Sequence, residues 1–407
     1  MGNYKLWMSD LVFYDDNEVL FSAGQFNGLF KADLRVGKAE FISPFPNERR
    51  LQSRLHSVAI KYKDEIIFFP DLSKYITIYN VRNNAFLNIE YPIENKNSTM
   101  KYLPKIVSGI LVGSSVYAFS SKDPCILRYD FHTRKLKVYH DWVDEFKSYG
   151  YKENTSFFCR DICQAGKSIL ARTYQNNVIV EFNIESEKVL FHQIEEKTAV
   201  VICGNEDKAW LISEEGTKLY TWNIKKRMLE SIEPKKELKN IRNYQCSVEF
   251  QGEVWFFPYL YRPVLILDQS SNKYKIKEMF NITVDEKYSD NILGSVWFKK
   301  VYNGNLYMMS VLENKIYCFS DSNCKVFCTE IYIDRTVRNK YLLQEKNMRH
   351  FSGIMLEEED SIWGDTRNLE DYLDLIVLDD SDLRQKNKIE RNGIKIYRSC
   401  TEFLRGD

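Results

Sequence analysis

The sequence predicts an all-β protein built from seven copies of one four-stranded unit, and two observations carry that prediction. The first is an internal repeat. Segment 65–90 (EIIFFPDLSKYITIYNVRNNAFLNIE) aligns without a gap with the segment that begins at Glu253 (EVWFFPYLYRPVLILDQSSNKYKIKE). Similarity at a fixed spacing, in segments with strand-forming residues, is typical of repeat architectures. The second observation is that the end of the third strand of this unit recurs throughout residues 1–334.

The third strand of each unit ends in an apolar or aromatic residue followed by Asp or Asn, which we call the anchor. The pairs recur at intervals of 40 to 53 residues, the last one degenerate: Ala32-Asp33, Tyr79-Asn80, Tyr129-Asp130, Phe182-Asn183, Trp222-Asn223, Leu267-Asp268 and Phe319-Ser320. Asp and Asn side chains accept hydrogen bonds from backbone N–H groups two residues on and so stabilise a tight turn. A Lys follows five residues after the anchor in five units, where its charge discourages edge-to-edge pairing of the outer strand.

The strands within a unit differ in pattern. Second strands are continuously apolar, as at 66–69 and 254–257, whereas third and fourth strands alternate, as at 75–79 and 135–139. Continuous apolar strands are buried on both faces, and alternating strands are half exposed. Sheets of this kind bury both faces when they stack around an axis. We therefore expect a seven-bladed β-propeller of four-stranded antiparallel blades over residues 1–334, with anchors near residues 33, 80, 130, 183, 223, 268 and 320.

Two details of this architecture stay open at the level of sequence. The fifth unit is short and the seventh lacks its acidic anchor, so six blades plus an irregular sheet is an alternative. The alignment gives the first and seventh blades four strands each without strand exchange. Lys5 to Met8, or the C-terminal tail, is nevertheless a candidate for an added strand.

The third-strand motif resembles the second half of a kelch repeat. It is clearest in Val178–Asn183 (VIVEFN) and Ile126–Asp130 (ILRYD). The Gly-Gly pair that ends the second strand of kelch repeats is missing, and Ala23-Gly24 comes nearest to it. The resemblance implies a propeller fold and implies no particular kelch function.

Beyond Asp334 the repeat pattern stops, and residues 335–407 are expected to form a C-terminal extension. Asn368 is suited to an N-cap, Glu370 and Asp371 follow in the first turn, and Leu369 and Tyr372 begin an apolar face. These features predict a short amphipathic helix near residues 368–378. The extension either packs against the ring or presents this helix to a partner.

Composition and charge exclude several classes of function. Lys plus Arg and Asp plus Glu both total 57, so the chain lacks the basic excess of a nucleic-acid binder. It also lacks an N-terminal signal pattern and any apolar run of membrane-spanning length. The nine cysteines show no disulfide-framework spacing, which indicates reduced thiols. We therefore expect a cytoplasmic protein that binds neither nucleic acid nor membranes.

No motif points clearly to catalysis, a metal or a cofactor. Gly166-Lys167-Ser168 ends like a phosphate-binding loop, but it lies between two predicted strands and is better explained as a hairpin turn. The five histidines form no metal-ligand pair at helical spacing, and the cysteine clusters lack Cys-x-x-Cys spacing. No nucleophile-elbow motif is present. The sequence thus predicts no catalytic residue, metal or cofactor and favours a non-enzyme, although catalysis stays open.

One face of the predicted ring carries the loops that join second to third strands and fourth strands to the next blade; we call it the loop face. Polar and aromatic side chains gather there, which suits a protein or a sugar ligand. The candidate binding residues are Arg50, Arg54, Lys74, Asp123, Gln175, Asn176, Glu214, Tyr259, Tyr261, Arg262 and Glu313.

Two functions are compatible with this pattern. The first is a non-catalytic interaction module, a scaffold that docks a protein partner through its loop face. The alternative is a carbohydrate-binding or carbohydrate-active propeller that uses Tyr, Arg and Glu around the central channel. A fold by itself does not choose between them, because one fold hosts many activities.

Overall fold

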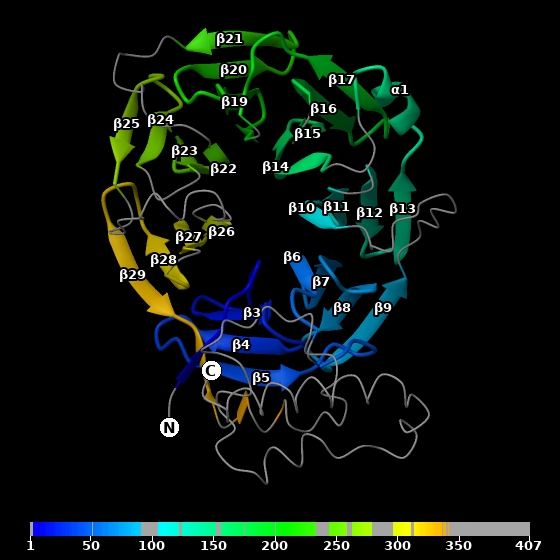
Figure 1. Ribbon diagram of the computed structural model, residues 1–407, viewed down its shortest axis with the longest axis vertical. Helices are drawn as coiled ribbons and strands as arrows, with labels where there is room; N and C mark the ends of the chain where they lie inside the picture. The colour runs from blue at the N-terminus through cyan, green and yellow to red at the C-terminus, as the bar shows by residue number, and fades with distance from the viewer. Residues whose placement is uncertain are drawn as a thin grey trace, which may run out of the picture. The chain divides into compact units, whose positions relative to one another are not determined.

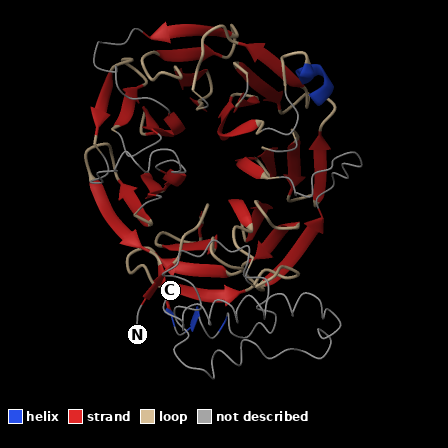
Figure 2. Ribbon diagram, in the orientation of Figure 1, coloured by secondary structure: helices blue, strands red, loops and turns tan. Residues whose placement is uncertain are grey.

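The computed structural model describes residues 3–50, 52–90, 105–121, 124–151, 156–174, 176–199, 201–232, 244–258, 263–278, 296–310, 313–335, 337–338 and 341. Contacts group Asn3–Ile333 into one compact unit, and Met1–Gly2 with Asp334–Asp407 into another. The first unit is a ring of seven sheets around a central channel (Figures 1 and 2). The predicted helix at 368–378 lies outside the described residues and stays a prediction.

Each sheet consists of four consecutive antiparallel strands, with the first strand innermost. The first three blades are β2 (Val12–Phe13), β3 (Glu18–Ser22), β4 (Leu29–Asp33) and β5 (Ala39–Ser43); β6 (His56–Tyr62), β7 (Glu65–Pro70), β8 (Tyr75–Asn80) and β9 (Ala85–Glu90); and β10 (Ile106–Val112), β11 (Ser115–Ser120), β12 (Ile126–Asp130) and β13 (Lys135–Tyr139).

The remaining four blades follow the same order. They are β14 (Phe158–Ala165), β15 (Ser168–Thr173), β16 (Val178–Asn183) and β17 (Val189–Gln193); β18 (Cys203–Gly204), β19 (Lys208–Ile212), β20 (Leu219–Asn223) and β21 (Met228–Ile232); β22 (Tyr244–Phe250), β23 (Glu253–Pro258), β24 (Val264–Asp268) and β25 (Tyr274–Lys277); and β26 (Val296–Tyr302), β27 (Asn305–Ser310), β28 (Lys315–Phe319) and β29 (Lys325–Glu330). The prediction of seven four-stranded blades is confirmed.

The core of the protein lies between blades. Ile67 and Phe69 of the second blade pack with Val116 and Ala118 of the third in one apolar cluster. Equivalent clusters join the first and second, third and fourth, fourth and fifth, fifth and sixth, and sixth and seventh blades. This packing explains the continuous apolar pattern of the second strands, because they are buried on both faces.

The ring closes through its own ends, without strand exchange. β1 (Asn3–Lys5) pairs with β30 (Tyr332–Asp334) in a separate two-stranded sheet, so neither segment adds a fifth strand to a blade. Beside it, the Leu6 N–H donates to the Ile331 carbonyl at 2.8 Å, and the Tyr332 N–H donates to the Gly37 carbonyl at 2.9 Å.

The predicted turn chemistry holds at the six regular anchors. The Asp33 carboxylate accepts the Arg35 N–H at 2.8 Å, and the Asp268 carboxylate accepts the Ser271 N–H at 2.7 Å. Hydrogen bonds from the Ser270 hydroxyl, the Ser271 N–H and the Ser271 hydroxyl lower the pKa of Asp268 to about 2. Four residues after the anchor the backbone is left-handed in each of these turns, at Gly37, Asn84, Arg134, Glu187, Arg227 and Asn272.

The anchor of the seventh blade differs from the prediction. Phe319-Ser320 does not provide it; Asp321 does, since its carboxylate accepts the Asn323 N–H at 2.6 Å and the Cys324 N–H at 3.0 Å. The pairing of β28 with β29 is irregular between Cys318 and Phe319. This irregularity moves the turn along by one residue, which a fixed spacing does not anticipate.

One element was not predicted, and one rejected motif is explained. The short helix α1 (Val143–Lys147) lies between the third and fourth blades, with Val143 and Phe146 buried beside Trp142. Gly166-Lys167-Ser168 is the turn between β14 and β15, with Gly166 at φ 58°. The prediction of a hairpin turn at this motif is therefore confirmed.

His56, the first residue of β6, is a buried histidine in the core between the first two blades. It is 5% exposed and lies against the rings of Phe45 and Phe68, with Nδ1 3.0 Å from the Ser22 hydroxyl. Burial lowers its pKa to about 3. The imidazole is therefore neutral in the folded protein at all but very acid pH.

Replacing His56 with Asn should flatten the acid limb of the stability profile. The unfolded chain takes up a proton near the ordinary pKa of about 6.5, whereas the folded protein does so only near pH 3. The contribution of neutral His56 to the free energy of unfolding is thus fully present above about pH 6.5. Below that pH it is lost, by up to about 1.4 kcal/mol per pH unit.

The measurement is urea unfolding of wild type and His56→Asn from pH 8 to pH 4, at steps of about 0.5 unit. The difference in unfolding free energy between the two proteins should change only below about pH 6.5. His140→Asn, at an exposed position, is the matched control and should keep the wild-type profile. A pH-independent difference for His56→Asn contradicts this account.

Candidate functional site

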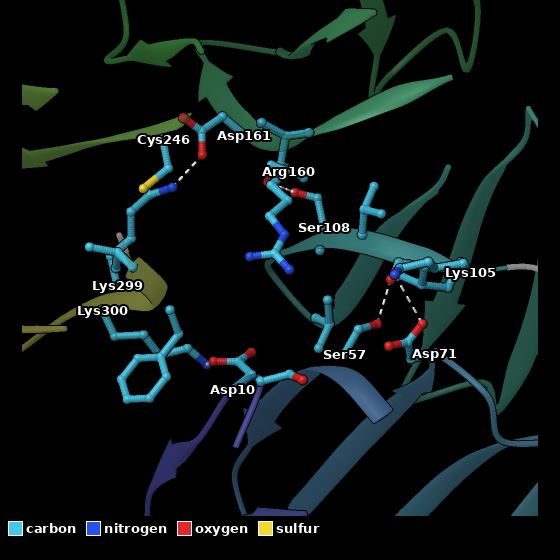
Figure 3. Close-up of a pocket in the computed structure, with 18 of the residues that line it drawn as sticks. Asp10, Ser57, Asp71, Lys105, Ser108, Arg160, Asp161, Cys246, Lys299 and Lys300 are labelled. Atoms are coloured by element: carbon cyan, nitrogen blue, oxygen red, sulfur yellow. Dashed lines mark hydrogen bonds and ion pairs between the residues drawn. The ribbon is translucent and has the colours of Figure 1, made fainter. Parts of the chain in front are cut away.

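The candidate site is a cavity of about 240 Å³ in the central channel (Figure 3). Its walls come mainly from the innermost strands β6, β10, β14 and β26. Polar and charged side chains dominate where these strands face one another. They are Ser9, Asp10, Arg54, Ser57, Asp71, Lys105, Ser108, Arg160, Asp161, Lys299 and Lys300.

A recurring backbone irregularity directs these side chains into the channel. The pairing of the first with the second strand shifts near the start of β6, β10, β14, β22 and β26. Such bulges turn a side chain that regular pleating would hide. At three of them a side chain links to the next blade. The Ser57 hydroxyl donates to the Ile106 carbonyl, the Ser108 hydroxyl donates to the Arg160 carbonyl, and the Gln245 side-chain oxygen accepts the Val296 N–H at 3.5 Å.

Asp161 of β14 is the most buried charge of the channel, at 2% exposure. Its carboxylate accepts the Ser247 N–H at 2.6 Å and the Ser247 hydroxyl at 3.0 Å, and it pairs with the Lys299 ammonium. It thereby links the fourth blade to the sixth and seventh. This link thus connects blades on either side of the fifth blade, whose innermost strand β18 has only two residues.

Burial acts on both members of this pair. It raises the pKa of the Asp161 carboxyl, against the opposing effect of the Lys299 ammonium. Burial alone would lower the pKa of Lys299, but the Asp161 carboxylate outweighs it and the pKa is raised. The carboxylate and the ammonium are in direct contact, so each compensates the charge of the other.

A second link joins the seventh, first and second blades. Lys300 forms an ion pair with Asp10 at 2.9 Å and donates to the carbonyls of Leu11 at 2.6 Å and Ala59 at 2.9 Å. The other Asp10 oxygen accepts the Ala59 N–H at 2.9 Å. Three blades are thus held together by one lysine and one aspartate.

At the loop-face end of the channel, two cations share one buried carboxylate. Arg54 donates to one oxygen of Asp71 at 3.0 and 2.8 Å, and the Lys105 ammonium lies 3.2 Å from the other. Burial lowers the pKa of Lys105; the positive charges of Arg54 and Arg160 lower it further, and Asp71 opposes both. Burial is the largest of these effects on the pKa of Lys105.

Six of the eleven candidate binding residues fall within the described part of the chain. Arg54 lines the cavity. The other five are not among its lining residues. The Arg50 carbonyl accepts the Asn27 N–H, the Lys74 N–H donates to Glu48, and the Asn176 side chain donates to the Tyr149 carbonyl. Glu214 is exposed, and Glu313 accepts the Tyr317 hydroxyl. Asp123, Gln175, Tyr259, Tyr261 and Arg262 lie outside the described residues, and their role stays a prediction.

Sequence reasoning missed most of the charged groups of the cavity. A signal was present, because the Arg160-Asp161 and Lys299-Lys300 pairs interrupt otherwise apolar first strands. Charges inside an innermost strand need partners across the channel. The pairing itself depends on the ring geometry and could not be derived from spacing.

Cysteine and metal chemistry contribute little to this site. Eight cysteines in the described part of the chain are free, and six of them are buried. Burial raises the pKa of Cys246, which lines the cavity, to about 11, so its thiol is protonated at neutral pH. Among the described residues no group of His, Cys, Asp and Glu is arranged to hold a metal ion.

None of the helices in the described residues is both long enough and apolar enough to cross a membrane.

Comparison with known proteins establishes similarity of fold only. No protein-family model matches the sequence, and no curated protein matches it significantly. The kelch assignment therefore stays a prediction. The WD40 repeats of RRP9 are similar in structure, with a TM-score of 0.51 and 12% identity over 76% of this chain and 88% of that one.

Two further solved structures have lower scores. The extracellular domain of the putative one-component system BT4673 from B. thetaiotaomicron has a TM-score of 0.48 and 12% identity. The match covers 76% of this chain and 38% of that one. U3-55K has a TM-score of 0.49 and 11% identity, over 76% and 90% of the two chains. The chain thus spans well under half of the BT4673 domain. The likeness to the RRP9 repeats shows the β-propeller fold and nothing finer.

Replacing Asp161 with Asn should destabilise the ring by about 3–5 kcal/mol, because it leaves the Lys299 ammonium buried without its counter-charge. Urea unfolding at pH 7 measures the effect. The double variant Asp161→Asn/Lys299→Met should recover much of the loss, since it removes both charges.

The matched control for this experiment is Asp144→Asn. Asp144 is paired with Lys147 on α1 but its side chain is 88% exposed, so the change should leave the free energy of unfolding close to that of wild type. If Asp161→Asn were as stable as this control, the ion pair would not be a structural link.

Proposed function

We propose that this protein is a non-catalytic interaction module, a rigid propeller that docks a protein partner through its loop face. The observation that carries the proposal is that the carboxylates in the cavity are paired with cations. Asp10, Asp71 and Asp161 are each paired with cations, and the Asp10 and Asp161 pairs join different blades. Such pairs hold a ring rigid, whereas a catalytic pair of carboxylates needs access to a substrate.

Rigidity favours docking because a preformed surface loses little conformational entropy on binding. On the loop face, Leu72 and Tyr174 are 41% and 43% exposed, in the loops after the second strands of the second and fourth blades. Exposed Lys74 and Glu214 occupy equivalent loops of the second and fifth blades. Apolar anchors with charged neighbours are the usual composition of a protein interface.

Fold analogy and cysteine chemistry support the same proposal. β-Propellers often serve as scaffolds for protein interaction, which is an argument from fold alone. The free thiols of the described cysteines fit a reducing compartment and support a cytoplasmic location as part of the proposal. No observation favours the carbohydrate alternative, since the described residues of the cavity include Asp, Lys and Arg but neither Tyr nor Glu.

Affinity capture from an extract of the protein's own cells tests the proposal, with wild type and two variants compared. The loop-face variant carries Leu72→Glu and Tyr174→Glu. It should lose a partner that wild type retains at near-equal stoichiometry, because charges replace two apolar contacts.

The matched control carries Val36→Glu and Met228→Glu, at the opposite ends of the blades, where the side chains are 61% and 56% exposed. It has the same charge change and should retain the partner. Loss of the partner in both variants, or in the control alone, would refute docking through the loop face. Retention of no partner by wild type would remove the support for a scaffold.

A further inference from the structure

A second cavity lies at the loop-face end of the fourth blade and shares no described lining residue with the channel cavity. Its volume is about 520 Å³, and the described residues that line it are Tyr149, Asn176, Asn177, Gln193, Ile194 and Glu195. They come from the connection between β13 and β14 that contains α1, from the loop between β15 and β16, and from the segment after β17. Figure 1 shows α1 beside β17. All three connections belong to the loop face, so the cavity lies on the face proposed for docking.

Hydrogen bonds hold these three connections together. The Asn176 side chain donates to the Tyr149 carbonyl at 2.6 Å, and the Ile194 N–H donates to the Asn177 carbonyl at 2.8 Å. The Thr173 hydroxyl at the end of β15 donates to the Asn176 carbonyl at 2.9 Å. The walls of the cavity are therefore preformed, and a preformed site loses little conformational entropy on binding.

Three polar side chains of this cavity have hydrogen-bonding groups that are not used. The amides of Asn177 and Gln193 and the carboxylate of Glu195 make no side-chain hydrogen bond or ion pair with a described residue. The Gln193 and Glu195 side chains are also exposed. A ligand can therefore bind to all three groups without breaking a contact, which is not true of the paired carboxylates in the channel.

The unused groups complement an arginine side chain. A guanidinium has five N–H donors, no acceptor and a positive charge. It suits the Glu195 carboxylate, with which it can form two parallel hydrogen bonds, and the side-chain oxygens of Asn177 and Gln193. The volume of the cavity lies within the roughly 300–1,000 Å³ of ligand pockets, so a whole side chain can enter. Arginine is also enriched among the residues that contribute most to protein interfaces.

A sugar ring fits the cavity less well, because the aromatic ring in its described lining is engaged elsewhere. The Tyr149 ring stacks on Phe146 with centroids 5.7 Å apart and contacts Phe191 at 5.4 Å, so it belongs to the apolar cluster between the third and fourth blades. We propose that the cavity receives an arginine side chain of the docked protein partner. This inference rests on the proposed function, and the exposed Tyr174 of the same β15–β16 loop is the apolar anchor beside it.

Saturation-transfer NMR with two small probes tests the cavity directly. The probes are Nα-acetyl-arginine amide and Nα-acetyl-citrulline amide, which are similar in shape but differ in charge. Wild type should bind the arginine probe saturably and the citrulline probe about fivefold more weakly, because citrulline lacks the charge that pairs with Glu195. Glu195→Gln, a change at an exposed position, should weaken binding of the arginine probe by a similar factor of about five.

The matched control is Glu206→Gln. Glu206 is exposed in the turn between β18 and β19, at the opposite end of the blades, so this variant loses the same charge and should bind like wild type. Equal binding of both probes, equal weakening in both glutamate variants, or no saturable binding of the arginine probe would overturn the arginine pocket. Tighter binding of free L-arginine than of the capped probe would indicate a free amino acid and overturn the partner's arginine as the ligand.

Affinity capture separates this inference from the docking proposal. A partner that wild type and Glu206→Gln retain should bind Glu195→Gln about ten- to a hundredfold more weakly, because the ion pair is shielded from water in the complex. Undiminished binding to Glu195→Gln would overturn the inference and leave the docking proposal intact. Retention of no partner by wild type would refute docking and with it the partner's arginine, whereas the probe titration would still show whether the cavity takes a guanidinium.

Discussion

Each four-stranded sheet in this protein has two apolar faces, and both faces are buried only when the sheet has a neighbour on each side. The requirement passes from blade to blade until the last sheet meets the first. At that junction the Phe13 ring stacks on Tyr302 with centroids 4.0 Å apart, and the paired strands β1 and β30 form a separate sheet of their own. Closure of the ring is therefore the condition for burying the apolar core between the blades.

The channel at the centre creates a second constraint. Seven innermost strands converge there, and bulges in five of them direct polar and charged side chains into a small space. Charges taken out of water must be paired. Asp161 with Lys299 and Asp10 with Lys300 meet that need and join blades that are distant in sequence.

The short innermost strand of the fifth blade is part of this arrangement. β18 has two residues, and β14 of the fourth blade directly contacts β22 of the sixth. The hydrogen bonds from Ser247 to Asp161 cross this place. On the channel side of the fifth blade, where strand pairing is shortest, a polar contact between the neighbouring blades therefore compensates for the missing strand pairing.

The sequence by itself predicted the four-stranded blades, most of their turns and, with six blades as the alternative, their number, because these depend on local rules. Asp33 and Asp268 bond to backbone groups two or three residues away, and alternation within a strand reports which face is buried. Arg54 could be placed on the loop face for the same reason, since a loop that follows a fourth strand must lie there.

Only the tertiary structure decided the charged cavity, the closure of the ring and the anchor at Asp321. Asp161 and Lys299 lie 138 residues apart in the chain, and no periodic pattern relates them. Their contact depends on the bulges in β14 and β26 and on the short strand β18 of the fifth blade, which are irregularities within the closed ring. Such adjustments depend on the positions of all seven sheets together, so a reading of one segment at a time does not contain them.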